Sequence, residues 1–106
     1  YAPQLIMIAA GYDGHFSDPL ASLLLKASSF SRMTAMLKAE FKLPFIVSLE
    51  GGYDLKGLAL SVFATICELA SLPCGIEKEE VPPGEKDCSF KVIEEVKRVH
   101  SCYWPL

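Results

Sequence analysis

Two short apolar runs, each followed by a glycine-containing polar loop, constrain the fold of this chain more than any other feature. The first run, QLIMIAA at residues 4–10, stops at Gly11, and the second, FIVSL at residues 45–49, leads into EGGYDL. Runs of this length without polar alternation are typical of strands buried on both faces of a parallel sheet. A helical pattern separates them, so the chain is predicted to contain a βαβ unit with a right-handed crossover.

Three segments have the periodicity of helices: residues 28–41, a segment ending near residue 70, and a segment beginning near residue 89. Ser28 or Ser29 is the expected cap of the first helix. The residues expected to face a core are the apolar ones at helical spacing: Met33, Met36, Leu37 and Phe41, then Leu58, Val62, Ile66 and Leu69, then Val92, Val96 and Val99. The stretch GIEKEEVPPGEKDC, residues 75–88, is predicted to be a polar connection.

Two parallel strands do not make a finished sheet, because their outer edges would keep unpaired backbone groups. The chain has 106 residues and opens at Tyr1 without an initiator methionine. We therefore expect residues 1–106 to be one part of a larger α/β domain.

The composition excludes several classes of protein. Hydrophobic residues make up 51% of the chain and charged residues 22%, as in a globular domain and unlike a disordered one. The net charge is −3 without a lysine or arginine cluster, which disfavours direct binding to nucleic acid or an anionic membrane, and the apolar runs are too short to cross a bilayer. Four cysteines without a C-x-x-C pair predict reduced thiols in a cytosolic or nuclear protein: Cys67, Cys74, Cys88 and Cys102.

Both polar loops leave the carboxyl ends of the predicted strands, where ligands collect in open α/β sheets. If the strands are neighbours, the loops share one rim and bring together six polar side chains: Asp13, His15, Asp18, Glu50, Tyr53 and Asp54. Asp13 is either a metal ligand or the acceptor of an Asx-turn. His15 is a second ligand or a hydrogen-bonding surface group, and Asp18, which precedes a proline, is more simply a turn former or a helix-side cap.

Tyr53 follows two glycines, Gly51 and Gly52, which permit positive φ and let the backbone pass close to a ligand or to another segment. Such a turn could hold the phenol against a reaction centre. The alternative is a buried tyrosine whose hydroxyl is hydrogen-bonded.

The two loops together, AGYDGHFSDPLA and LEGGYDL, resemble the C-terminal half of the zinc-dependent histone deacetylase family, and more closely its class II, bacterial and plant members. The ending VIEEVKRVHSCYWPL is similar to the terminal helix of class II enzymes. The resemblance covers essentially the whole chain. It implies that residues 1–106 are the C-terminal portion of an arginase/deacetylase-like catalytic domain, an α/β fold of three layers with a parallel sheet.

The resemblance also implies roles for individual residues. Asp13 matches the family's third zinc ligand, and Tyr53 matches the tyrosine whose hydroxyl hydrogen-bonds the substrate carbonyl. Gly51 and Gly52 match the glycines of the wall beside the acyl-lysine channel, and Leu20 matches a channel-lining position that suits an acetyl-lysine stem. In this family His15 corresponds to no zinc ligand, and Asp54 stands where asparagine is more usual.

The function implied is a zinc-dependent amidohydrolase that removes acetyl groups from lysine side chains of histones or other proteins. This would make it a regulator of chromatin and transcription, in the nucleus or cytoplasm, with a corepressor complex as partner. Retention of Tyr53, where a weakly active subgroup has histidine, favours a competent enzyme. The family's Asp-x-His ligands and paired catalytic histidines are not among these 106 residues, so the isolated chain is expected to be inactive. Two alternatives remain open: an acetylpolyamine or other small-amide deacetylase, and a non-catalytic truncated interaction module.

Overall fold

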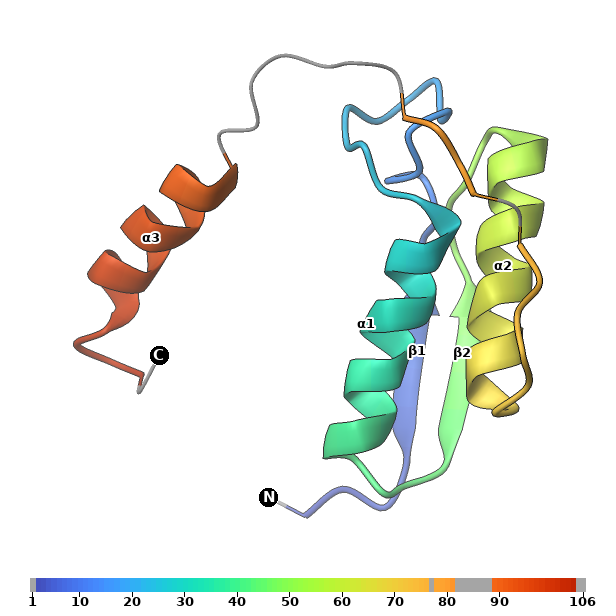
Figure 1. The fold of residues 1–106 in the computed structure, drawn as a ribbon. Coiled ribbons are helices and arrows are strands. Elements are labelled where there is room, and N and C mark those ends of the chain that lie inside the picture. Colours follow the sequence, from blue (N-terminus) through green and yellow to red (C-terminus); the bar gives the residue numbers. More distant parts are fainter. Residues whose placement is uncertain (1, 77, 82–88, 105–106) are drawn as a thin grey trace.

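The computed structural model describes residues 2–76, 78–81 and 89–104 (Figure 1). The element order is the one predicted: β1 (Ile6–Ala10), α1 (Ala27–Glu40), β2 (Phe45–Leu49), α2 (Leu55–Leu69) and α3 (Ser89–His100). Part of the predicted polar connection, residues 77 and 82–88, lies outside the described residues, as do residues 105–106 at the end of the chain. None of the described helices is long and apolar enough to cross a membrane.

The two strands pair in parallel, in a register that runs from Ile6 opposite Phe45 to Ala10 opposite Leu49. In Figure 1, α1 and α2 lie in front of the sheet and β2 is to the right of β1, which is the expected right-handed crossover. The opposite face of the sheet is open among the described residues, since Met7 is 73% exposed and Ile46 is 47% exposed. The described residues therefore cover one face of the sheet only, because both packed helices lie on the same side.

The core lies between the sheet, α1 and α2. Tyr12 follows β1 and packs edge-on against Phe30 of α1, with ring centroids 5.1 Å apart. Small residues of α2, among them Ser61 and Ala64, are fully buried, and such residues let two helices approach closely. The aromatic pair anchors the loop after β1 to the helix that follows it.

The predicted core faces of the helices are only partly correct. In α1 the buried residues are Ala27, Phe30 and Thr34, whereas three of the four predicted core residues are exposed: Met33, Met36 and Phe41. In α2, Ile66 is also exposed. The reason is that α1 packs beside α2 through its Phe30 and Thr34 side, so the methionine stripe is left without a neighbour among the described residues.

The third helix begins at Ser89, as predicted, but contacts none of the other described helices or strands (Figure 1). Val92, Val96 and Val99 are 59%, 49% and 51% exposed, so they do not face a core in this structure. The amphipathic pattern correctly predicted the helix, and no described element lies against its apolar face.

Candidate functional site

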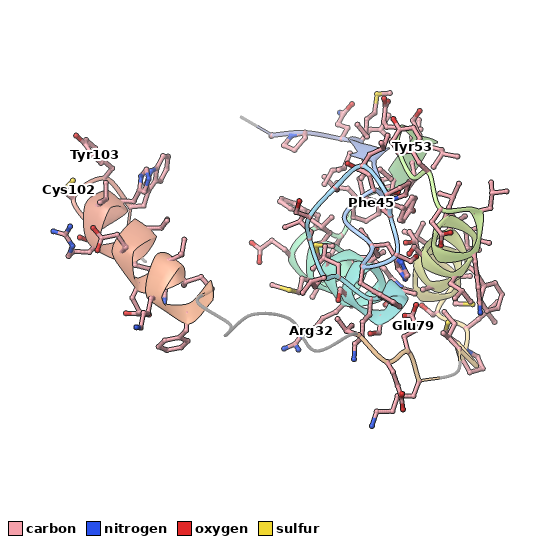
Figure 2. All side chains as sticks on the ribbon, turned by 90° about the horizontal axis from the view of Figure 1, so that it is seen from above. Arg32, Phe45, Tyr53, Glu79, Cys102 and Tyr103 are labelled. Carbon is pink, nitrogen blue, oxygen red and sulfur yellow. The ribbon has the colours of Figure 1, made fainter. Side chains whose placement is uncertain are left out.

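The loops that follow β1 and β2 are joined at the carboxyl end of the sheet. The strand pairing continues past the strand ends, since Glu50 N donates to Ala10 O at 3.0 Å and Tyr12 N donates to Gly51 O at 2.8 Å. The two segments that the sequence placed on one rim therefore do lie side by side. Figure 2 looks down on this rim from above.

Asp13 occupies a slot between two glycines. A Cβ atom on Gly11 would lie 2.8 Å from Asp13 Oδ1, and one on Gly51 would lie 3.0 Å from the same oxygen. The carboxylate is half-buried and accepts no hydrogen bond from the described residues, so it does not form the Asx-turn that was the alternative. Its oxygens remain free to meet a ligand.

Gly52 has a φ of +131°, a conformation that residues with a side chain rarely adopt. A Cβ on this residue would also lie 2.8 Å from Leu58 Cδ1 and 3.3 Å from Tyr12 Cβ. The turn thus needs glycine because it passes close to another segment, one of the two reasons expected from the sequence. Beyond the turn, Tyr53 is 59% exposed on the rim, so the described residues do not bury it (Figure 2).

Asp18 fastens the two loops to each other. Its buried carboxylate accepts the Leu20 N–H at 2.9 Å through Oδ1 and the Tyr53 N–H at 2.7 Å through Oδ2. Burial alone would raise the pKa of Asp18, but the backbone N–H groups of Tyr53 and Leu20, with further ones, hold that pKa below its ordinary value. The turn-forming role predicted for Asp18 is present, and the contact with Tyr53 was not foreseen. Leu20 itself is 72% exposed.

His15 is buried and not a surface group, which corrects one of the two predicted interpretations. Its Nε2 donates to Glu79 Oε1 at 2.7 Å, and its Nδ1 lies 2.8 Å from Ser17 Oγ. Both ring nitrogens thus have protein partners. The second proposed metal ligand of the Asp-x-His pattern is therefore engaged elsewhere.

Asp54 caps α2. Its Oδ2 accepts the Gly57 N–H at 2.7 Å and the Ser17 hydroxyl at 2.6 Å. The Ser17 hydroxyl, followed by the Gly57 N–H, lowers the pKa of the Asp54 carboxyl. This cap was missed in the sequence, although an aspartate directly before a helical run is a standard start signal. Glu79 and Tyr12 were also missed, and no local pattern marks their long-range contacts.

A zinc ion would find one suitable ligand in this arrangement. The slot of Asp13 presents a carboxylate that no described donor occupies, which is the chemistry of a zinc ligand. The described residues contain no group of three or more histidine, cysteine or acidic side chains that could hold a metal. The rim therefore offers one zinc ligand, and the exposed Tyr53 and Leu20 stand on the same two loops.

The chain is similar to several known proteins. The family model described as the histone deacetylase domain matches residues 1–69. A probable deacetylase of Archaeoglobus fulgidus is 34% identical over 119 residues, which cover 98% of this chain and 33% of that protein. Histone deacetylase HDA1 of Saccharomyces cerevisiae is 32% identical over 107 residues, covering 98% of this chain and 15% of that protein.

The structure of the histone deacetylase Clr3 superposes on 96% of this chain with a TM-score of 0.75 and 28% sequence identity, and the match covers 17% of that chain. The predicted fold class, an α/β fold of the arginase/deacetylase type with a parallel sheet, is thereby confirmed. This chain spans about a third of the archaeal relative and less than a fifth of the yeast one.

Proposed function

Because this chain belongs to the histone deacetylase family, we propose that it is part of a zinc-dependent hydrolase that removes acetyl groups from lysine side chains of proteins. In this proposal residues 1–106 form the C-terminal portion of the catalytic domain. The rest of that domain supplies the remaining zinc ligands and the histidine base.

One juxtaposition carries the proposal. The Asp13 carboxylate lies against Gly51, and Gly51 stands two residues before Tyr53 on the same rim. The bond from Tyr53 N to Asp18 holds the backbone of Tyr53 on this rim. A ligand bound at Asp13 and a carbonyl approached by Tyr53 would thus be served by neighbouring residues of one turn, which is compatible with hydrolysis of an amide beside a metal.

Asp13 would hold zinc together with ligands from the rest of the domain. When bound, zinc would supply Lewis acidity and a water of lowered pKa. Tyr53 would donate its hydroxyl proton in a hydrogen bond to the acyl oxygen, where negative charge develops as the amide carbon is attacked. Gly51 and Gly52 would form the wall beside the substrate, since neither carries a side chain.

The exposed Leu20 supports a lysine substrate. An apolar residue at the mouth of the site suits the four-carbon stem of an acetyl-lysine, whereas a polyamine carries further positive charges that favour acidic neighbours. We expect histone or other acetylated proteins as substrates, a corepressor complex as partner, and a nuclear or cytoplasmic location.

The test is turnover by the complete protein of an acetyl-lysine peptide and of acetylspermidine. A kcat/KM that is higher for the peptide is expected. Preference for acetylspermidine would make the protein a small-amide deacetylase, and absence of turnover of either compound would favour the non-catalytic interaction module.

A further inference from the structure

Glu79 makes a buried double contact that the proposed function does not use. Its Oε1 accepts from His15 Nε2 at 2.7 Å, and its Oε2 accepts from the Ala27 backbone N–H at 2.7 Å. The Glu79 side chain is 10% exposed and that of His15 is 3% exposed. A carboxylate taken this far from water is costly unless its oxygens are paired, and both oxygens of Glu79 are paired.

The start of α1 depends on this carboxylate. Ala27 is the first residue of the helix, and its N–H has no acceptor within the helix. Lys26, at the cap position, carries a side chain that cannot accept a hydrogen bond, and the first turn of α1 contains no acidic residue. Glu79 supplies both the missing acceptor and the negative charge that a helix N-terminus favours.

From His15 the contacts continue to the start of α2. Ser17 N donates to His15 Nδ1 at 3.3 Å, and Ser17 Oγ, which lies 2.8 Å from the same nitrogen, donates to Asp54 Oδ2 at 2.6 Å. Asp54 caps α2 at Gly57. Four residues therefore form one hydrogen-bonded chain, Glu79–His15–Ser17–Asp54, which joins the N-terminal ends of α1 and α2.

This hydrogen-bonded chain runs through both loops of the candidate site. His15 stands two residues after Asp13, and Asp54 directly follows Tyr53. Seen from above in Figure 2, however, the labelled Tyr53 and Glu79 lie on opposite sides of the loop after β1. The described side-chain contacts of Glu79 are with His15 and Ala27 and not with Tyr53, so Glu79 would influence the reaction only through other residues.

We propose that Glu79 is a positioning residue for the deacetylase reaction: through His15, Ser17 and Asp54 it holds the Asp13 loop and the Tyr53 turn in register. This inference rests on the proposed function for its kinetic consequence. It gives Glu79, which the sequence placed in a polar connection, a role in supporting the candidate site.

A second contact allows the same hydrogen-bonded chain to be disturbed without removing a polar group. A Cβ on Gly57 would lie 2.5 Å from His15 Nδ1 and 2.8 Å from Ser17 Oγ. Gly57→Ala therefore displaces the imidazole, while alanine by itself favours a helix more than glycine does. The clash lowers the stability of the variant and the higher helix propensity of alanine raises it, so the two effects partly cancel. Loss of activity by this variant would therefore indicate that the loops are displaced and not that the protein is unfolded.

The experiment compares the complete protein with Glu79→Gln, Gly57→Ala and the control Glu80→Gln. Glutamine has one acceptor oxygen and cannot receive both His15 and Ala27, whereas Glu80 is exposed. Amide hydrogen exchange is measured over residues 11–18 and 50–57, and kcat and KM are measured per bound zinc, well below the unfolding temperature of each variant.

We expect Glu79→Gln and Gly57→Ala to raise exchange in both loops and to lower kcat on the order of tenfold, with KM within about twofold, and Glu80→Gln to match the wild type. Unchanged exchange in the two loops would overturn the inference, as would an unchanged kcat in folded Gly57→Ala or Glu79→Gln. Inactive wild-type protein would defeat the proposed function alone, because the exchange measurement would still decide the positioning of the loops.

Discussion

The carboxylate of Asp18 accepts the backbone N–H of Tyr53 at 2.7 Å, although 35 positions separate the two residues in the chain. The same carboxylate accepts the N–H of Leu20. One buried side chain thus fixes the backbone on which the proposed hydrogen-bond donor stands and the loop that carries the proposed channel residue. A backbone held in this way loses little freedom when a substrate binds, which helps a site to orient its side chains.

Substitution of Gly52 should damage the turn that carries Tyr53. Gly52→Ala forces a side chain into positive φ and against Leu58, and we expect a loss of about 1–3 kcal/mol in the free energy of unfolding of the complete protein. Chemical denaturation measures it. Gly75→Ala is the matched control, because a Cβ there meets no atom within 4 Å, and its effect should stay within about 0.5 kcal/mol. Equal stability of the two variants would contradict the strained turn.

The buried hydroxyl of Ser61 has no hydrogen-bond partner among the described residues. Removing an unsatisfied polar group from a helix interior should stabilise the protein, so Ser61→Ala is expected to gain about 1 kcal/mol in the free energy of unfolding. The neighbouring Thr65→Val provides the contrast, because Thr65 Oγ1 donates to Ser61 O at 2.9 Å and its loss should destabilise by about 1 kcal/mol. Thermal unfolding should therefore show that one variant is more stable than the wild type and the other less stable. A Ser61→Ala protein that is less stable than the wild type would refute the claim that this hydroxyl has no partner.

Acid should weaken the junction of the two loops. Because the folded protein holds the pKa of Asp18 below its ordinary value of 3.8, ionised Asp18 stabilises the fold at any pH above that value. The stabilisation is lost as the pH falls through the lower, folded-state pKa. Unfolding midpoints measured from neutral pH down to below 3.8 should therefore decline less steeply for Asp18→Asn than for the wild type. Glu50→Gln, which changes an exposed side chain, should retain the wild-type profile, and identical profiles for all three proteins would count against the role of Asp18.

The helices, the strands and the nearness of the two loops could be predicted from the sequence. The long-range hydrogen bonds that hold the two loops together could not. Apolar runs ending at Gly11 and at the Gly51–Gly52 pair predicted parallel strands and their loops, because backbone pattern and turn chemistry are local. The contacts of Asp18 with Tyr53 and of Glu79 with Ala27 join residues 35 and 52 positions apart, and periodicity carries no such information. The prediction that Met33 faces a core was not met for a related reason, since spacing identifies an apolar face of a helix but not the element that covers it.

The isolated 106-residue chain should not retain zinc. Asp13 offers one carboxylate, and the described residues contain no group of three metal-ligating side chains, whereas zinc sites in proteins use three or four ligands. After dialysis against metal-free buffer, metal analysis of the purified chain should find no stoichiometric zinc, and the complete protein treated alike should keep it. A full equivalent of zinc in the isolated chain would show that the ligands had been misassigned.

The Tyr53 hydroxyl is proposed to stabilise the charge that develops on the acyl oxygen, and the kcat of Tyr53→Phe in the complete protein measures this contribution. Phenylalanine keeps the ring and removes only the donor, so the substitution isolates that hydrogen bond. We expect kcat on an acetyl-lysine peptide to fall by about a hundredfold or more, with zinc content unchanged. A variant that turns over as fast as the wild type would contradict it.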